Sequence, residues 1–167
     1  VSNGGQTGTT TLQNVGNEGN VTVGGVNAGG LRGGNHDSKG IIVMQRCYTT
    51  GQIVSLGRGE SAALAGWLGG SSSSRIENCW TTAEVTGQDG AKEAYRGTAQ
   101  VKNCYSVTGG QFTQFDADEV STGELTWKLN GKSFLSPQWY QTINEDEYPT
   151  WQPKGIVYAD GEDSFAD

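Results

Sequence analysis

Histidine, proline and cysteine are scarce in this chain, which contains one, three and three of them among 167 residues. Hydrophobic residues make up only 34% of the sequence. No run of about 18 apolar residues occurs, so the sequence predicts no membrane span. The apolar content is also too low to fill a wide globular core. We therefore expect a thin core that is shared along a stack of repeated elements.

Basic residues are few as well. The chain has 11 Lys and Arg against 18 Asp and Glu, which gives a formal net charge of −7. Binding to nucleic acid requires Lys and Arg clustered on one face, and no basic run occurs here. The composition therefore argues against a nucleic-acid partner and favours an acidic, solvated surface.

The cysteines and the single histidine do not form a recognisable reactive site. Cys47, Cys79 and Cys104 are odd in number and lack the C-x-x-C spacing of zinc sites. Each occupies the same position in a repeated phrase, so we predict buried apolar side chains stacked repeat on repeat. His36 stands beside Asp37 in a polar turn, where a solvated loop histidine is favoured over a member of a catalytic triad. The sequence predicts no catalytic residue, no metal site and no cofactor.

Acidic residues gather in two places, at 116–119 and at 145–147. A glycosidase needs two carboxylates held across a substrate cleft, one of them with a raised pKa, whereas these groups lie in polar loops. Charge at a helix terminus explains Asp118 and Glu119. A calcium site at Asp116 and Asp118 is the less favoured alternative, because the spacing is not that of an EF-hand.

Repeated phrases account for much of the remaining sequence. Three segments align without gaps, QRCYTT at 45–50, ENCWTT at 77–82 and KNCYSV at 102–107, and a weaker copy, NEGNVT, lies at 17–22. The step from Cys47 to Cys79 and the shorter step from Cys79 to Cys104 both fall within the period of about 20–50 residues that is typical of solenoids and repeat arrays. A glycine-bounded phrase precedes the first two cysteine phrases, as GGLRGG at 29–34 and LAGWLGG at 64–70.

The cysteine phrase predicts a strand with a bend. Ile76 and Val101 are expected to point inward, as is the cysteine three residues later. Strict strand alternation cannot place both inside, so the residue before the cysteine must lie at a bend. That residue is Asn78 or Asn103 in two copies, and Arg46 interrupts this asparagine ladder in the first copy.

Aromatic residues follow the cysteines directly. Alternation along the strand points Tyr48, Trp80 and Tyr105 outward, where stacking of repeats at about 4.8 Å would produce a flat aromatic ladder. Such a strip suits the apolar face of a sugar or a partner protein. We take these three residues, together with Trp67 of the second glycine phrase, as candidate ligand-binding residues. The alternative is that they pack on one another or beneath a neighbouring segment.

One helix is expected, over residues 120–131. Ser121 and Glu124 match a capping box, Leu125 shares a face with Leu129, and Gly131 stands where a helix terminator belongs. Such a short helix must pack on something. We predict that it covers the open end of the stacked repeats.

Phrases of the form N-C-Y/W-x-T joined to G-G-L-x-G-G resemble the GLUG-motif repeats of bacterial cell-surface proteins. The stretch GELTWKLNG at 123–131, followed by WYQTI at 139–143 and Tyr148-Pro149, is similar to the ending that such repeats carry in Bacteroides-type gut bacteria. The resemblance spans roughly residues 17 to 158. It implies extracellular display on adhesin-like or carbohydrate-related proteins.

The sequence thus predicts an all-β fold, a short right-handed parallel β-solenoid with a small C-terminal cap. Its parts are an irregular lead-in (1–16), repeats (17–115), the cap with short strands at 139–143 and 156–158 (116–158), and an acidic tail (159–167). Val1 is not an initiator methionine, so we expect a C-terminal piece of a longer secreted protein.

The expected function is a non-catalytic extracellular module for surface display, adhesion or glycan contact. Its partners would be a glycan, a host or partner protein, and neighbouring domains of a larger parent chain. An accessory carbohydrate-binding module is one alternative. A fragment of a polysaccharide lyase or glycoside hydrolase, using acids on the solenoid face, is another.

Overall fold

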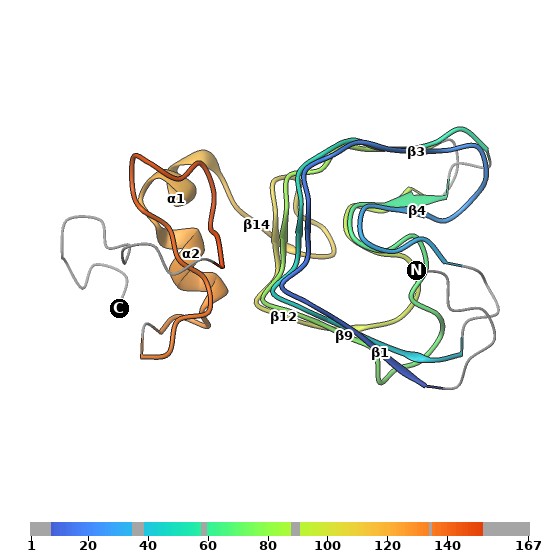
Figure 1. Ribbon diagram of the computed structural model, residues 1–167, viewed down its shortest axis with the longest axis horizontal. Helices are drawn as coiled ribbons and strands as arrows, with labels where there is room; N and C mark the ends of the chain where they lie inside the picture. The colour runs from blue at the N-terminus through green and yellow to red at the C-terminus, as the bar shows by residue number, and fades with distance from the viewer. Residues whose placement is uncertain (1–7, 35–38, 58–59, 88–90, 134, 152–167) are drawn as a thin grey trace.

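The computed structural model describes residues 8–34, 39–57, 60–87, 91–133 and 135–151. The described chain is mostly short β-strands, with two short helices near its C-terminal end (Figure 1). The described residues form four sheets, and every strand pair within these sheets is parallel. The expectation of an all-β chain is confirmed, and the parallel sheets fit a β-helix-like fold.

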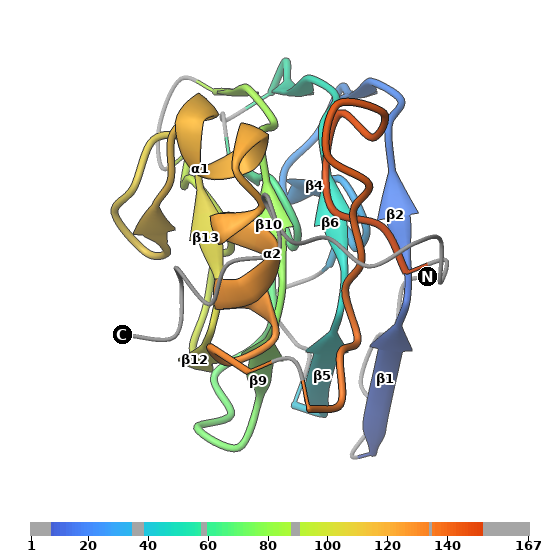
Figure 2. The same cartoon turned by 90° about the vertical axis from the view of Figure 1, so that its left-hand side faces the viewer.

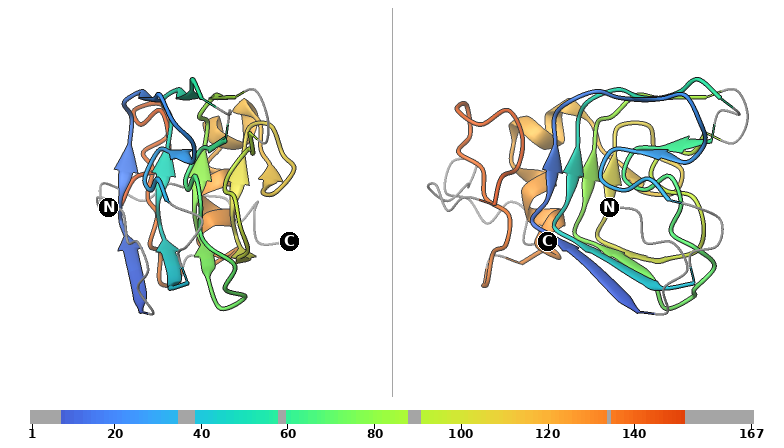
Figure 3. Two further views of the ribbon diagram at one scale, coloured as in Figure 1. Left: turned by 90° about the vertical axis from the view of Figure 1, so that its right-hand side faces the viewer. Right: turned by 45° about the vertical axis from the view of Figure 1, so that its right-hand side comes forward.

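The strands are distributed over the sheets in a regular order. Sheet A contains β1 (Thr9–Gln13), β5 (Ile41–Gln45), β9 (Arg75–Glu77) and β12 (Gln100–Lys102). Sheet B contains β2 (Gly16–Asn17), β6 (Tyr48–Thr49), β10 (Trp80–Thr81), β13 (Tyr105–Ser106) and β14 (Thr113–Gln114). Sheet C contains β3 (Val21–Val23), β7 (Ile53–Ser55) and β11 (Val85–Thr86), and sheet D contains β4 (Ala28–Gly29) and β8 (Ser61–Ala62). In the first two passes the chain runs through A, B, C and D before it returns to A, whereas the third goes from β11 of sheet C to β12 of sheet A. We call each such run of the chain from sheet A back to sheet A a pass, and Figure 3 shows the successive passes side by side.

The register of the sheets reproduces the spacing of the repeats. Thr9 pairs with Ile41, and Val43 pairs with Arg75. Both pairings span the 32 residues that also separate Cys47 from Cys79. Arg75 pairs in turn with Gln100, and this step spans only 25 residues, so the last pass is the shortened one. The two cysteine spacings are therefore the lengths of two successive passes of the chain.

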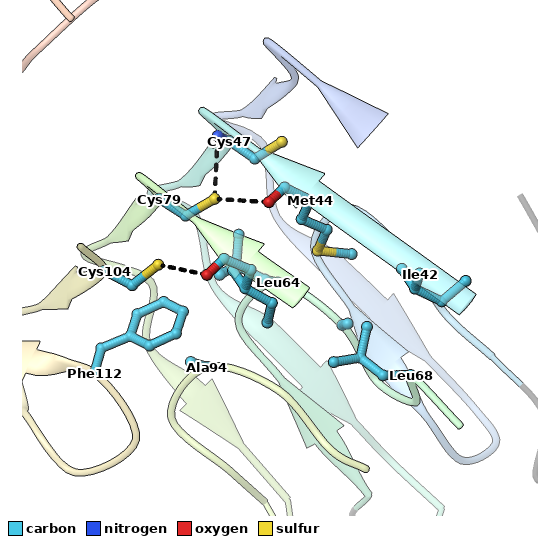
Figure 4. Close-up of a cluster of buried hydrophobic side chains, with 11 residues drawn as sticks. Ile42, Met44, Cys47, Leu64, Leu68, Cys79, Ala94, Cys104 and Phe112 are labelled. Atoms are coloured by element: carbon cyan, nitrogen blue, oxygen red, sulfur yellow. Dashed lines mark hydrogen bonds between the residues drawn. The ribbon is translucent and has the colours of Figure 1, made fainter. Parts of the chain in front are cut away.

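A thin core runs through the passes, and the cysteines form one wall of it (Figure 4). Cys47 and Cys79 are fully buried and Cys104 is 3% exposed, which confirms their inward orientation. All three are free thiols. The Cys79 Sγ accepts a hydrogen bond from the Cys47 backbone N at 3.3 Å, and the Cys104 Sγ donates to the Ile76 carbonyl at 3.3 Å. The thiols thus bond from pass to pass as well as packing.

The bend before each cysteine is present, and the first pass has the same bend before Val15. Asn14, Arg46, Asn78 and Asn103 all have positive φ, between 49° and 54°. Asparagine adopts this left-handed conformation more readily than most residues. Asn103 donates to the Asn78 side chain at 3.1 Å, and the Arg46 Nε donates to the Asn14 Oδ1 at 2.7 Å. Arg46 thus keeps the corner conformation, but no side-chain hydrogen bond joins it to Asn78 in the described chain, so the asparagine ladder is interrupted there as the sequence predicted.

Of the two residues expected to point inward three positions before a cysteine, Ile76 is buried and Val101 is not. Ile76 is fully buried. Val101 pairs in register with Ile76 but is 37% exposed, because β12 is the last strand of sheet A and no further strand covers it.

The glycine phrases lie where the chain folds back closely on itself. A Cβ atom on Gly30 would stand 2.5 Å from the Ala63 carbonyl oxygen, which leaves room only for glycine. Residues 91–98, which have fewer glycines than the two earlier phrases, keep the same alignment, since Lys92 and Tyr95 form parallel bridges with Ala62 and Ala65.

Part of the expected lead-in is regular structure. Residues 1–16 were expected to be irregular, but β1 pairs with β5 along its whole length and β2 begins at Gly16. The sequence of β1, TTTLQ, lacks the cysteine phrase that marks the later passes, although its threonines favour a strand. At the other end of the chain, the strand expected over 156–158 and the acidic tail lie outside the described residues.

The expected helix over 120–131 is two helices, α1 (Ala117–Ser121) and α2 (Glu124–Leu129). Asp116, not Ser121, is the N-cap of α1, and its side chain accepts from the Glu119 backbone N. Gly123 separates the helices with φ of 82°, a left-handed conformation that ends an α-helix. The terminator at Gly131 was predicted correctly, with φ of 71° just past the C-cap of α2.

These helices lie beside the passes of the chain and do not cover their open end. Figure 2 shows α1 and α2 over β13 and β10, with the following segment over β6 and β2. Leu125 and Leu129 are buried against Trp80 and Tyr105 of sheet B. The prediction of a terminal cap is therefore wrong, because the apolar surface that the helices bury is the aromatic face of sheet B.

Candidate functional site

The predicted aromatic ladder is present on sheet B. Trp80 pairs in register with Tyr48 on one side and Tyr105 on the other. The rings of Tyr48 and Trp80 stack with their centroids 4.7 Å apart and an angle of 2° between their planes. This distance is the spacing of neighbouring strands, so the in-register pairing sets the stack.

The ladder is not a free surface strip. Trp80 is 1% exposed and Tyr105 is 8% exposed, whereas Tyr48 is half-buried. Tyr105 packs in the cluster that contains Leu125 and Leu129 of α2. Trp80 and Tyr105 therefore follow the alternative prediction, in which the aromatic residues pack beneath a neighbouring segment.

Residues 135–151, which we call the strap, cross the remainder of the ladder. Tyr140 and Thr150 form an antiparallel bridge within the strap, with N···O distances of 2.8 and 2.7 Å. This bridge is the only regular pairing in the described part of the strap, so the strand expected over 139–143 is reduced to one residue. Trp139 meets both Tyr48 and Trp80 edge-on, with centroids 6.4 Å away.

A cleft of about 430 Å³ remains between the strap and sheet B. Its volume lies within the range of small-molecule sites, about 300–1,000 Å³. We call it the aromatic cleft. The residues that line it are Glu18, Tyr48, Thr50, Trp80, Thr82, Glu147, Tyr148, Pro149 and Thr150.

Three aromatic rings line the cleft. Tyr148, at the tip of the strap, stacks on Trp80 with centroids 5.0 Å apart and an interplanar angle of 22°. Tyr48 and Tyr148 are both half-buried, so part of each ring remains accessible. The cleft therefore presents tyrosine surface to a ligand, while Trp80 forms its floor.

The charge of the cleft is negative. Glu18 and Glu147 are exposed, and no Lys, Arg or His is among the lining residues. The Tyr48 hydroxyl donates to the Glu18 Oε1 at 2.6 Å. Burial and the adjacent Glu18 carboxylate raise the pKa of Tyr48 to about 12. Burial, followed by the charge of Glu147, also raises the pKa of Tyr148.

Several polar groups in the cleft have no partner in the described chain. The hydroxyls of Thr50 and Thr82, at equivalent positions in two repeats, make no hydrogen bond to described residues and are partly exposed. The indole N–H of Trp80 also has no hydrogen-bond partner among the described residues, but this nitrogen is buried and not accessible from the cleft. A ligand with hydroxyl groups would supply both donors and acceptors for such a surface.

The structure thus places two of the four candidate ligand residues, Tyr48 and Trp80, in the lining of the aromatic cleft. Tyr105 lies under α2 and does not line the cleft. Trp67 is elsewhere, with the guanidinium carbon of Arg96 5.5 Å from its ring centroid. His36 lies outside the described residues.

Two acidic residues at the start of α1 have structural partners. Asp116 caps α1, and the Glu119 carboxylate pairs with the Lys128 Nζ at 2.7 Å. The described residues contain no group of three or more His, Cys, Asp or Glu placed to hold a metal ion.

Sequence reasoning missed Glu18, Glu147 and Tyr148 as residues of the site. The threonines had a usable pattern, because Thr50 and Thr82 each stand two residues after a ladder aromatic. Nothing in the local sequence marks the strap tip, since it joins the cleft only through long-range packing.

Comparison with protein-family models, with curated proteins and with solved structures found no match. Among the described residues, no helix has the length and apolar content to cross a membrane.

Proposed function

We propose that this chain is a non-catalytic extracellular module, built as a short right-handed β-solenoid, that contacts glycans through the aromatic cleft. In this proposal it belongs with the GLUG-motif repeat proteins of the bacterial cell surface, where it serves display or adhesion. The fold proposal is supported by parallel pairing at a constant separation of 32 residues between the first three passes.

One observation carries the glycan proposal. The aromatic cleft combines accessible tyrosine surface, threonine hydroxyls without a partner in the described chain, and two exposed carboxylates in a single hollow of about 430 Å³. Sugars have apolar ring faces bordered by hydroxyl groups, so they match aromatic surface edged with hydrogen-bonding groups. The repeats supply one wall of this site and the strap supplies the other.

A glycan array probed with the purified chain tests the proposal. We expect binding to a defined class of glycans, which Tyr148→Ala should abolish or weaken several-fold by removing an accessible ring. Tyr140→Ala is the matched control, because Tyr140 is a half-buried strap residue that does not line the cleft. Absence of binding to any plant, host or microbial glycan would refute the proposal, as would equal losses in both variants.

Glycoside hydrolysis is a second candidate, and one observation favours it. Glu18 and Glu147 line the same cleft, and such hydrolysis uses two carboxylates. Both are exposed, however, whereas a general acid is kept protonated by burial. Release of new reducing ends from a glycan that binds, lost in Glu147→Gln, would identify a hydrolase and overturn the non-catalytic proposal.

A further inference from the structure

The charges around the aromatic cleft are of one sign. Glu18 borders it from the loop after β2, and Glu147 borders it from the strap. Glu147 makes no hydrogen bond or ion pair with the described chain, and the only such partner of Glu18 is the uncharged Tyr48 hydroxyl. Because no cationic side chain lines the cleft, neither carboxylate is neutralised there.

The aromatic rings, like the two carboxylates, favour a positively charged ligand in the cleft. The face of an aromatic ring is negative and attracts a cation within about 6 Å of its centroid. Tyr48 and Tyr148 stack on Trp80 and cover its faces, so the ring surface open to a cation in the cleft is the partly exposed surface of the two tyrosines. The raised pKa values of Tyr48 and Tyr148 have a contribution from the neighbouring carboxylates, as a negative potential requires.

We propose that the aromatic cleft binds a protonated amino sugar, with the sugar ring on tyrosine surface and its ammonium group between Glu18 and Glu147. The proposal rests on the proposed function, because it specifies which class of glycan the cleft takes. A free amine places a positive charge beside the carboxylates and rings. An N-acetylated sugar places a neutral amide there instead, and a uronic acid places a repelled negative charge.

The sugar ring distinguishes this ligand from a simple amine such as a lysine side chain. Thr50 and Thr82 offer hydroxyls that need partners, which a polyhydroxylated ring provides and an alkyl chain does not. The volume of about 430 Å³ also exceeds what an ammonium group with a narrow alkyl stem would fill.

Calorimetric titration with matched oligosaccharides tests the inference. The probes are a glucosamine tetrasaccharide, the N-acetylglucosamine tetrasaccharide and a tetralysine peptide, in a buffer acidic enough to keep the sugar amine protonated. We expect the glucosamine probe to bind most tightly and to weaken as salt is added, because added ions screen exposed charges.

Carboxylate variants locate the effect. Glu18→Gln and Glu147→Gln should each weaken glucosamine binding about two- to fivefold, as expected for an exposed ion pair. Glutamine can still accept the Tyr48 hydroxyl bond, so Glu18→Gln tests charge alone. Glu145→Gln is the control, since Glu145 is an exposed strap residue outside the cleft.

The outcomes separate the two proposals. Equal affinity for the amine and acetylated probes would overturn the amino-sugar inference and leave glycan binding standing. Tetralysine binding as tightly as the glucosamine probe would overturn it too, because the cleft would then recognise an ammonium without a sugar. Failure of both sugar probes would overturn the inference, and failure on the whole glycan array would remove the proposed function as well.

Discussion

The indole N–H of Trp139 donates a hydrogen bond of 2.9 Å to the backbone carbonyl of Asn78, 61 residues earlier in the chain. The indole of Trp151 makes the equivalent bond, at 2.7 Å, to the carbonyl of Arg46. Asn78 and Arg46 occupy the same left-handed corner in consecutive passes. No backbone N–H of the described chain bonds these two carbonyls. The strap therefore attaches to the repeats by completing two equivalent corners.

Replacing Trp139 by phenylalanine tests this attachment. Trp139→Phe keeps a ring in place but removes the indole N–H, which leaves the Asn78 carbonyl without that donor. We expect the free energy of unfolding to fall by about 1–2 kcal/mol. Urea denaturation followed by circular dichroism measures the change.

Trp151→Phe should have a similar cost, because its bond is equivalent. The two tryptophan rings stack with centroids 5.8 Å apart, so the double variant is expected to deviate from additivity. If Trp139→Phe is as stable as the parent, ring packing and not the corner bond holds the strap.

The three buried cysteines, Cys47, Cys79 and Cys104, are expected to react slowly with thiol reagents. Burial is the main cause that raises the pKa of Cys79, and the pKa of Cys47 is raised first by its hydrogen bond with Cys79 and then by burial. Because the thiolate is the reactive form, both thiols should resist alkylating reagents in the folded protein and react after denaturation. Mass spectrometry of the labelled chain measures this difference.

Rapid labelling of all three thiols without denaturant would contradict the prediction that they are protected by burial. Replacing Cys79 by serine places a hydroxyl in an apolar wall, so Cys79→Ser should lower stability by about 1–3 kcal/mol.

The Tyr48 phenol predicts how stability changes with alkaline pH. Its pKa in the folded protein is about 12, above the value near 10 expected for an unfolded chain. Below about pH 10 both states keep the proton, so stability is unaffected. Between about pH 10 and 12 the unfolded state loses the proton first, and stability falls as pH rises.

Tyr48→Phe should therefore reduce the loss of stability over that pH range, measured by urea titrations at several pH values. Glu18→Gln should reduce it partly, since the Glu18 charge and hydrogen bond contribute to the shift after burial. An unchanged slope in Tyr48→Phe would show that this phenol is not linked to unfolding.

The sequence predicts the features that depend on the repeat and misses those that depend on the strap. The inward cysteines and the corners follow from a phrase that recurs every 32 or 25 residues, which parallel pairing converts into register. The burial of Trp80 does not follow, because alternation gives the direction of a side chain and not what lies over it. Trp151 reaches its partner across 105 residues, a contact that no local pattern encodes.

The start of α1 and the break between α1 and α2 were also not predicted correctly from the sequence, although they depend on residues close by in the chain. Two capping patterns overlap in this segment, Asp116 with Glu119 and Ser121 with Glu124, and the structure uses the first. Ser121 ends α1, where its hydroxyl bonds the Asp118 carbonyl at 3.0 Å. Gly123 was the decisive residue, because its left-handed conformation ends the first helix before the second begins.

The assignment of Asp116 as the N-cap of α1 can be tested directly. Asp116→Ala should lower stability by about 1 kcal/mol, since the Glu119 N–H loses its acceptor. Ser121→Ala should cost only a few tenths of that, because Ser121 is exposed at the end of α1. Thermal denaturation of both variants compares them, and a larger loss in Ser121→Ala would favour a helix that begins at 121.

Removing the strap tests whether it is an integral wall of the molecule. A chain that ends after Ser133 keeps both helices but loses Trp139, Tyr148 and Trp151, which contact the ladder. Loss of even one buried tryptophan costs about 3–5 kcal/mol, so we expect destabilisation of at least that size. The uncovered ladder should also bind a hydrophobic dye and promote aggregation.

A chain that ends after Trp151 is the matched control, because it retains every strap contact described here. It should unfold at a higher denaturant concentration than the chain ending after Ser133 and bind less dye. If instead the chain ending after Ser133 unfolds at the same denaturant concentration as the control, the strap contributes nothing to stability. Tyr48 and Trp80 would then be available as an open strip, and the aromatic cleft would not be the site. The expected loss follows from the burial of Trp80, which is 1% exposed and stacks on Tyr148 of the strap.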